Sequence, residues 1–232
     1  MRGKLIVLDG LDGSGKSTQA QLLADQLRHE GNRVELLSYP DYSQPSSALV
    51  KLYLNGELAD NADDVNAYAA SSFYAVDRYA SYMQFWKDKL EQGITMIASR
   101  YVSSNAIHQM GKLPREEWDA FLQWLDDFEY QKLGLPRPDQ IIFLDMSRAV
   151  ADRLIMSRYH GDQTKKDLHE QNMNYMQRCM ESAHYAALKQ HTSIEMTETM
   201  DSKKTHIISI TELFQPIIRR FCVHWFTVPA SE

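Results

Sequence analysis

Five short apolar runs recur along the chain, separated by longer amphipathic stretches. They lie at residues 5–8, 34–37, 95–98, 140–144 and 193–196. Short apolar strands that alternate with helices are typical of a parallel sheet with helices on both faces. We therefore predict an α/β fold built on a five-stranded parallel sheet.

Helical spacing of apolar residues predicts the segments between the strands. The expected helices cover residues 17–30, 72–92, 115–130, 149–158, 172–190 and 205–225, the last interrupted by Pro216. There is no internal repeat or linker, so residues 1–232 are predicted to form a single domain. The polar segment at about 158–171 is either a solvated connection or a lid that keeps water from a reaction site.

Composition narrows the possible partners and compartment. The chain has 232 residues, 44% of them hydrophobic, and a net charge of −6 with dispersed basic residues, which disfavours nucleic acid as a partner but allows a single nucleotide. No apolar run is long enough for a membrane span, and the run at 5–8 is too short for a signal peptide. Cys179 and Cys222 lack metal or redox spacing. We expect a cytoplasmic protein whose cysteines serve in packing.

The sequence from Gly10 to Ser17 carries the pattern G-x-x-x-x-G-K-[ST], directly after the first predicted strand and at the start of a helix. In this context the backbone amides cradle phosphates and the helix N-terminus attracts them. Lys16 is expected to reach the β and γ phosphates, and the hydroxyl of Ser17 to join the shell of Mg²⁺. The pattern implies ATP or GTP with Mg²⁺, and of these we predict ATP and Mg²⁺ as cofactors. The nucleotide is expected on Gly10, Gly13, Ser14, Gly15, Lys16, Ser17 and Thr18.

Further blocks resemble the thymidylate kinase family of P-loop nucleoside monophosphate kinases. The blocks are residues 9–19 (DGLDGSGKSTQ), 39–42 (YPDY) with 52–56 (LYLNG), 73–78 (FYAVDR), 99–106 (SRYVSSNA) and 133–139 (LGLPRPD), and they follow the family's order over most of residues 4–139. The resemblance implies transfer of the γ-phosphoryl group of ATP to dTMP, giving ADP and dTDP for dTTP biosynthesis. It also implies a homodimer.

Two arginines are candidates for binding the acceptor phosphate. Arg100 follows the third predicted strand, and open α/β sheets bind ligands outside the carboxyl ends of their strands. Arg78 lies on a predicted helix beside aromatic residues. Guanidinium groups can bind a phosphate through two hydrogen bonds, although arginines more often form surface salt bridges.

The resemblance assigns further roles in the acceptor pocket. Tyr74 would stack on the thymine ring, Pro40 would line the space for its methyl group, and Asn105 would hydrogen-bond the base edge. Asp12 would contact the sugar and help to organise the metal. Tyr74 could instead belong to a helix core, and Asn105 could cap a helix.

The chain departs from the family pattern at three positions. Ser99 stands where the family usually has an aspartate near Mg²⁺, His108 where related sequences often have a tyrosine near the sugar 2′ position, and Asp9 where glutamate is common. In addition, Gly13 groups the chain with members that supply a transition-state arginine from the lid. Arg158 is the first candidate for that cation, ahead of Arg153, Lys165 and Lys166.

Two other functions remain open at this stage. A deoxynucleoside kinase would activate a neutral 5′-hydroxyl with a carboxylate base, for which Asp9 is a candidate. A nucleotide-binding relative with reduced catalysis, marked by Ser99, would serve regulation or assembly.

Overall fold

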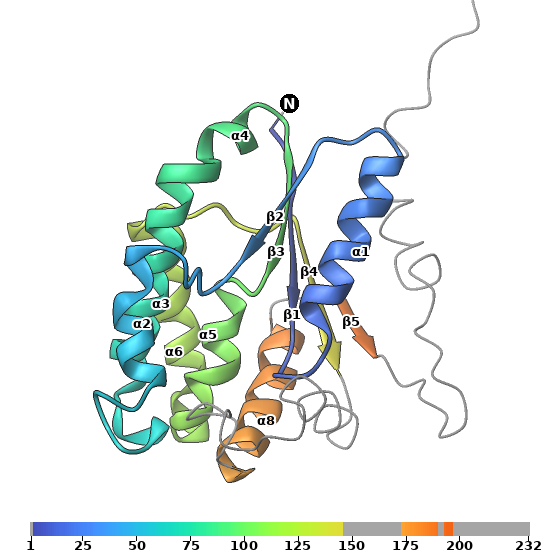
Figure 1. Ribbon diagram of the computed structural model, residues 1–232. Coiled ribbons are helices and arrows are strands. Elements are labelled where there is room, and N and C mark those ends of the chain that lie inside the picture. Colours follow the sequence, from blue (N-terminus) through green and yellow to red (C-terminus); the bar gives the residue numbers. More distant parts are fainter. Residues whose placement is uncertain (1, 146–172, 190–192, 197–232) are drawn as a thin grey trace, which may run out of the picture.

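The computed structural model describes residues 2–145, 173–189 and 193–196 (Figure 1). The predicted helices at 149–158 and 205–225 and the predicted lid at 158–171 lie outside these residues, as do Arg153, Arg158, Lys165, Lys166 and Cys222. The single-domain assignment for residues 1–232 stays a prediction.

A parallel sheet forms the centre of the molecule. Its strands are β1 (Leu5–Asp9), β2 (Val34–Ser38), β3 (Thr95–Ser99), β4 (Gln140–Asp145) and β5 (Ser193–Met196), in the spatial order β2-β3-β1-β4-β5. The registers Leu8↔Ser99 and Asp9↔Phe143 bring the carboxyl ends of β1, β3 and β4 to one edge, at the bottom of Figure 1. The predicted α/β architecture is confirmed, and this edge is where such sheets bind ligands.

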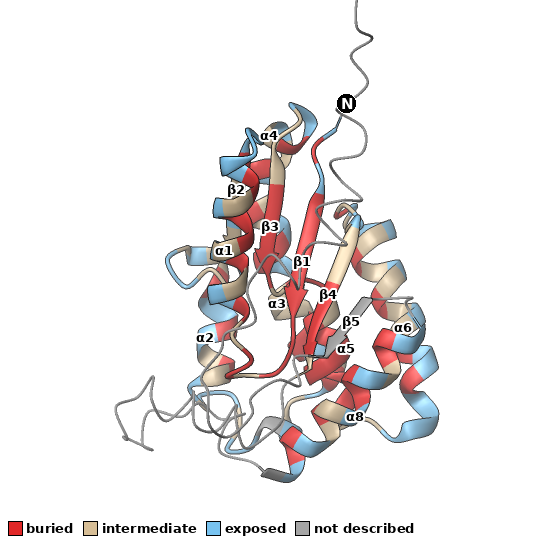
Figure 2. Ribbon diagram, turned by 90° about the vertical axis from the view of Figure 1, so that its right-hand side faces the viewer, coloured by how far each residue is buried: buried red, intermediate tan, exposed pale blue. Residues whose placement is uncertain are grey.

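Alternating side chains of β1 build a core on each face of the sheet. Ile6 and Leu8 pack against α1 (Lys16–His29), which contributes Leu23 and Leu27. On the other face Leu5 and Val7 belong to a second apolar cluster, which the later helices cover. Figure 2 shows the central strands buried between the two layers. This arrangement explains why the strands read as continuous apolar runs rather than as alternating ones.

The second layer contains most of the described helices. They are α2 (Ala48–Leu54), α3 (Ala67–Ser81), α4 (Lys87–Glu91), α5 (Ser103–His108), α6 (Trp118–Leu125) and α8 (Met173–Lys189), with π-helical segments η3 (Tyr82–Trp86) and η6 (Asp126–Lys132) and 3₁₀ turns η1 (Pro45–Ser47), η2 (Ala62–Asp64), η4 (Met110–Lys112) and η5 (Arg115–Glu117). In Figure 1 helices α2–α6 lie across the sheet from α1.

Several helix boundaries differ from the sequence prediction. The helix predicted to begin at residue 72 begins at Ala67, because the side chain of Asn66 caps it by accepting hydrogen bonds from the backbone of Tyr68 (2.8 Å) and Ala69 (3.2 Å). The helix predicted at 115–130 starts as a 3₁₀ turn and ends in a π-helical segment that reaches Lys132. Helices α2 and α5 were not predicted.

Two further expectations concern packing and membranes. Cys179 is buried in a cluster formed by α8, α5 and Phe143, and burial raises the pKa of its thiol to about 12. The predicted packing role of Cys179 is thus confirmed. Among the helices that the structure describes, none has the length and apolar character needed to cross a membrane.

Candidate functional site

The loop from Gly10 to Ser17 joins β1 to α1 and has the backbone that phosphate cradling requires. Gly10 and Gly15 have φ angles of 150° and 81°, in the range that favours glycine. A Cβ atom on Gly10 would also lie 2.7 Å from the carbonyl oxygen of Leu144. The loop therefore has no room for a side chain at position 10, and its curvature depends on its glycines.

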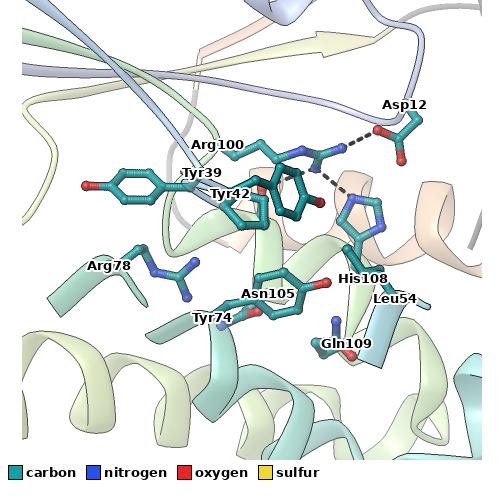
Figure 3. Close-up of a pocket in the computed structure, with 12 residues that line it drawn as sticks. Asp12, Tyr39, Tyr42, Leu54, Tyr74, Arg78, Arg100, Asn105, His108 and Gln109 are labelled. Atoms are coloured by element: carbon teal, nitrogen blue, oxygen red, sulfur yellow. Dashed lines mark hydrogen bonds and ion pairs between the residues drawn. The ribbon is translucent and has the colours of Figure 1, made fainter. Parts of the chain in front are cut away.

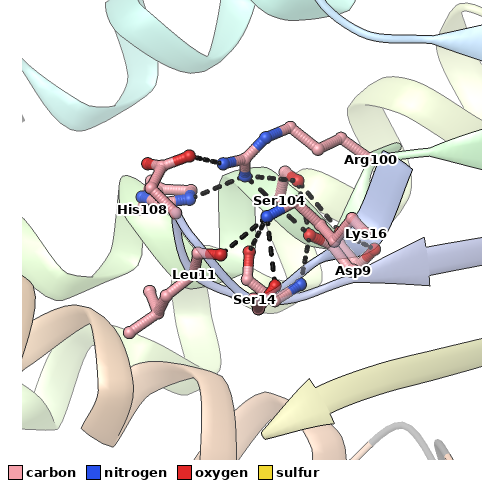
Figure 4. A network of polar contacts seen from close by, with 10 residues as sticks. Asp9, Leu11, Ser14, Lys16, Arg100, Ser104 and His108 are labelled. Atoms are coloured by element: carbon pink, nitrogen blue, oxygen red, sulfur yellow. Dashed lines mark hydrogen bonds and ion pairs between the residues drawn. The ribbon is translucent and has the colours of Figure 1, made fainter. Parts of the chain in front are cut away.

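Lys16 holds this loop from within. Its Nζ atom donates hydrogen bonds to the carbonyl oxygens of Gly10 (3.0 Å) and Leu11 (2.7 Å) and to Oγ of Ser14 (3.3 Å), as Figure 4 shows. The side chain is buried, while the next residue, Ser17, is exposed at the first turn of α1. A cation and a hydroxyl thus stand next to the backbone amides of the loop.

Asp9 connects the end of β1 to helix α5. Its carboxylate is fully buried and accepts hydrogen bonds from the backbone of Gly10 (2.9 Å) and the hydroxyls of Ser103 (2.6 Å) and Ser104 (2.8 Å). A buried carboxylate needs such donors, since burying an unpaired charge is costly. Asp9 therefore fixes α5 beside the loop.

Arg100 follows β3 directly and turns back toward the same loop. Its φ angle of 69° is rare for residues other than glycine and marks a constrained turn. Its Nη2 atom donates to Oδ1 of Asp12 (2.5 Å), and its Nη1 atom lies 2.9 Å from Nε2 of His108. Burial opposes the charge, but Asp12 and Asp9 outweigh it and raise the pKa of Arg100 above its usual value. A permanent cation therefore lies beside the loop.

Arg78 and Asn105 are held by a residue that the sequence analysis did not identify. Glu129, in η6, accepts two hydrogen bonds from Arg78, at 2.8 Å from Nε and 2.6 Å from Nη2, and one from Nδ2 of Asn105 at 3.0 Å. The side chains of Arg78 and Glu129 are 2% and 0% exposed. The alternative interpretation, that Arg78 forms a salt bridge on the protein surface, is therefore wrong. Burial acts against the charge of Arg78, yet Glu129 raises its pKa above the usual value.

A signal for Glu129 was present in the sequence. The buried residues Trp118, Phe121 and Leu125 are spaced as one helix face, and Glu129 continues that spacing by four residues. An acidic residue on a core-facing position predicts a buried partner. Asn105 likewise does not cap a helix, because it lies inside α5.

The segment after β2 forms another wall. Asp77, on α3, accepts hydrogen bonds from the backbone of Asp41 (3.0 Å) and the hydroxyl of Ser46 (2.6 Å). Tyr39 donates to the hydroxyl of Ser81 (3.1 Å), and burial raises the pKa of its phenol to about 12. These contacts hold the intervening Pro40 against α3.

One pocket brings these elements together (Figure 3). It contains all the predicted acceptor-binding residues, together with several that were not predicted. The lining residues are Asp12, Tyr39, Pro40, Tyr42, Leu54, Tyr74, Arg78, Arg100, Ser104, Asn105, His108 and Gln109. Arg100 and Asp12 lie at one end beside the loop, and Arg78 lies at the other.

Tyr74 and Gln109 complete the pocket. Tyr74 is partly exposed, lines the pocket and meets Tyr53 at a near right angle, with ring centroids 6.4 Å apart. Gln109 is 1% exposed, and its Oε1 atom has no hydrogen-bond partner among the described residues. A buried polar atom of this kind is expected to find a partner in a ligand or water.

The fold and the site define the class of this protein. A glycine-rich loop between a central strand and a helix, with an arginine-lined pocket beside it at the carboxyl edge of the sheet, is the arrangement of P-loop nucleotide-binding proteins.

Comparisons with known proteins identify the family. The sequence profile of the thymidylate kinase family matches residues 8–206. Thymidylate kinase of Homo sapiens is 33% identical over 150 residues, which cover 65% of this chain and 64% of the human protein. The Mycobacterium tuberculosis (strain H37Rv) enzyme is 31% identical over 181 residues, which cover 75% of this chain and 81% of that protein. The chain therefore belongs to the thymidylate kinase family, although its match spans just under two thirds of the human relative.

A solved structure supports the fold. Thymidylate kinase of Candida albicans superposes with a TM-score of 0.67 at 22% sequence identity, over 95% of this chain and 92% of that chain. At this sequence identity the similarity shows the fold only.

Proposed function

We propose that the protein transfers the γ-phosphoryl group of ATP to dTMP in a Mg²⁺-dependent reaction that yields ADP and dTDP. The observation that carries this proposal is the ion pair of Arg100 with Asp12, which joins the P-loop to a pocket lined by arginine, aromatic and amide side chains. A cation at that junction stands where an acceptor phosphate would meet a donor phosphate. Such a group reduces their repulsion and aligns the attack.

The donor side is the P-loop. ATP would bind along Gly10, Gly13, Ser14, Gly15, Lys16, Ser17 and Thr18. When a phosphate enters, the ammonium group of Lys16 can exchange the loop carbonyls for phosphate oxygens, which are the stronger acceptors.

Ser17 and Asp12 are the proposed protein ligands of Mg²⁺. The described residues hold no group of three or more His, Cys, Asp or Glu side chains that would bind a metal by itself. This fits Mg²⁺ in kinases, which keeps several waters and takes most other ligands from nucleotide phosphates. The exposed hydroxyl of Ser17 and the partly exposed carboxylate of Asp12 suit that mode. When bound, the ion would neutralise charge on the transferred phosphoryl group.

The acceptor side is the pocket. We assign the phosphate of dTMP to Arg100 and its sugar to Asp12 and His108. Tyr74 would stack on the base, Pro40 would border its methyl group, and Arg78 and Asn105 would face its polar edge. Arg158 stays the first candidate for the transition-state cation.

We also propose that the protein is a homodimer. Val76, Tyr79 and Met83 lie three and four residues apart along α3 and η3, and all are between 39% and 48% exposed. An exposed apolar stripe on a long helix is suited to pairing with a second copy of itself. Size-exclusion chromatography with light scattering should find a dimer, and a monomer for the double variant Val76→Glu, Met83→Glu.

The function is tested by ADP release from ATP with a panel of acceptors. We expect turnover with dTMP and much less with dAMP, dGMP or thymidine. A preference for thymidine would instead favour the deoxynucleoside kinase alternative, against which the full burial of Asp9 and its hydroxyl donors already count. Binding of ATP and dTMP without ADP formation would favour the alternative with reduced catalysis.

A further inference from the structure

The carboxylate of Glu129 holds two different pocket residues at once. It lies 51 residues from Arg78 and 24 from Asn105 along the chain, and it reaches both from the π-helical segment η6. Glu129 is fully buried and does not line the pocket. It can therefore act on a ligand only through these two side chains.

The hydrogen bonds of Asn105 decide which of its amide atoms faces the pocket. An amide nitrogen has two hydrogens, and both are used: Nδ2 donates to the carbonyl oxygen of Ser71 (3.2 Å) and to Glu129 (3.0 Å). The reverse orientation would set Oδ1 against two acceptors, so the amide has one stable position. Asn105 thus offers the pocket an acceptor, its Oδ1 atom.

Arg78 offers the opposite polarity. A guanidinium group carries five N–H donors and no acceptor. Nε and Nη2 donate to Glu129, whereas Nη1 has no hydrogen-bond partner among the described residues, and Arg78 lines the pocket. In Figure 3 Arg78 and Asn105 both lie in the part of the pocket away from Asp12.

We propose that Glu129 is a positioning residue that sets base selectivity, by fixing a donor from Arg78 next to an acceptor from Asn105. This inference rests on the proposed function. Thymine and uracil present the matching edge, an accepting O4 beside a donating N3–H. Cytosine presents the reverse, a donating amino group beside an accepting N3. With Glu129 in place, a cytosine would set donor against donor and acceptor against acceptor.

The test compares wild type with Glu129→Gln, by kcat/KM and by calorimetric binding for dTMP, dUMP and dCMP. The glutamine can donate to Oδ1 of Asn105, which frees that amide to turn over, and it no longer neutralises Arg78. We expect the ratio of the kcat/KM values for dTMP and dCMP to fall at least about tenfold. The wild-type protein rejects cytosine mainly because its buried polar groups would face mismatched partners, and the variant loses that mismatch. The dTMP:dUMP ratio should stay unchanged, because both bases share the same edge.

A matched control lies three residues earlier. Asp126, in the same π-helical segment as Glu129, forms a bidentate ion pair with Arg137. Both side chains are about half exposed, and neither lines the pocket. Asp126→Asn should leave every nucleotide ratio unchanged. If Glu129→Gln does not fold, Glu129→Asp retains the charge with a shorter reach, and the same narrowing of the dTMP:dCMP ratio is expected for it.

The outcomes separate the two proposals. A folded Glu129 variant that keeps the wild-type dTMP:dCMP ratio overturns the role of Glu129, whatever its overall activity. A wild-type protein that binds dTMP more tightly than dCMP but transfers no phosphoryl group to it refutes the proposed function alone. In that case the binding ratios of the variants still decide the role of Glu129.

Discussion

Two arginine–carboxylate pairs lie at opposite ends of the same pocket, and they differ in exposure. Arg100 and Asp12, at the proposed phosphate end, are 16% and 20% exposed, whereas Arg78 and Glu129, at the proposed base end, are 2% and 0% exposed. Removing one partner of a fully buried pair costs about 3–5 kcal/mol. A pair that solvent partly reaches costs less to break. The phosphate end can thus exchange partners with a ligand at low cost.

The difference in exposure also separates residues that can bind a ligand from residues that only support the pocket. At the phosphate end, Arg100 and Lys16 are joined to groups that a phosphate can replace, namely a carboxylate and loop carbonyls. At the base end, the carboxylate of Glu129 lies behind the pocket wall, where a ligand does not reach it. Substitutions at the phosphate end should therefore affect catalysis, and those behind the base end should affect stability and selectivity.

The largest effect is expected at Lys16. Lys16→Ala removes the ammonium that would meet the developing charge on the phosphates, so kcat/KM should fall by about 10³-fold or more. The melting temperature should change little. Coupled ADP release and a thermal melt measure both quantities, with Lys132→Ala as control, because Lys132 pairs with Asp127 on the surface. Folded Lys16→Ala protein with near-wild-type turnover would refute the P-loop assignment.

The next largest effect falls on stability. Glu129→Ala leaves the buried charge of Arg78 without its partner, so the free energy of unfolding should drop by about 3–5 kcal/mol. Asp126→Ala breaks an exposed pair of the same type and should cost about 1 kcal/mol or less. Urea denaturation of both variants gives the two values. Equal losses would show that burial does not distinguish these pairs.

Arg100 should show the reverse balance. Arg100→Ala removes the proposed acceptor-phosphate ligand, so the KM for dTMP should rise and kcat should fall, with kcat/KM lowered by about 10²-fold or more. The free energy of unfolding should fall by less than in Glu129→Ala, because solvent partly reaches the pair of Arg100 with Asp12. Steady-state kinetics with dTMP and ATP varied separately provide the test. A collapse of ATP binding with an unaltered response to dTMP would place Arg100 on the donor side instead.

The two ends also differ in how far the sequence predicts them. The P-loop is one continuous segment, Gly10 to Ser17, whose glycines and lysine are set by local backbone geometry. Arg100 follows from a topological rule, since it comes directly after a central strand. Both could be predicted because each depends on the chain within a few residues.

The base end depends on contacts between distant segments. Glu129 meets Arg78 only because η6 packs beside α3, and no local pattern states which helices lie together. Asn105 was predicted at the base edge, but the orientation of its amide follows from Ser71 and Glu129, which come from two other segments. The missed helices α2 and α5 have seven and six residues, too short for a clear periodicity.

A half-buried cation, Lys112, also lies near the proposed base end. The ammonium group of Lys112 donates to the hydroxyl of Tyr53 (2.7 Å) and to the carbonyl oxygen of Val65 (3.1 Å), and Tyr53 in turn supports the ring of Tyr74. Burial lowers the pKa of Lys112 to about 8, against a partial opposing effect of Asp63. Burial of the charged ammonium group therefore lowers the free energy of unfolding.

The smallest predicted effect is the pH dependence that this cost produces. At pH 7 Lys112 carries its proton in both the folded and the unfolded chain. The burial of its charge therefore destabilises the folded protein to the full extent. Above pH 8 the folded protein releases the proton while the unfolded chain, with a pKa near 10.5, keeps it, so stability from this group rises with pH. Relative to Lys112→Met, the free energy of unfolding of wild type should gain about 1–2 kcal/mol between pH 7 and pH 9.5. Comparing the two proteins cancels the tyrosines, whose ionisation begins to destabilise the fold near pH 10. A constant difference across this range would mean that solvent reaches Lys112 well enough to keep it charged in the fold.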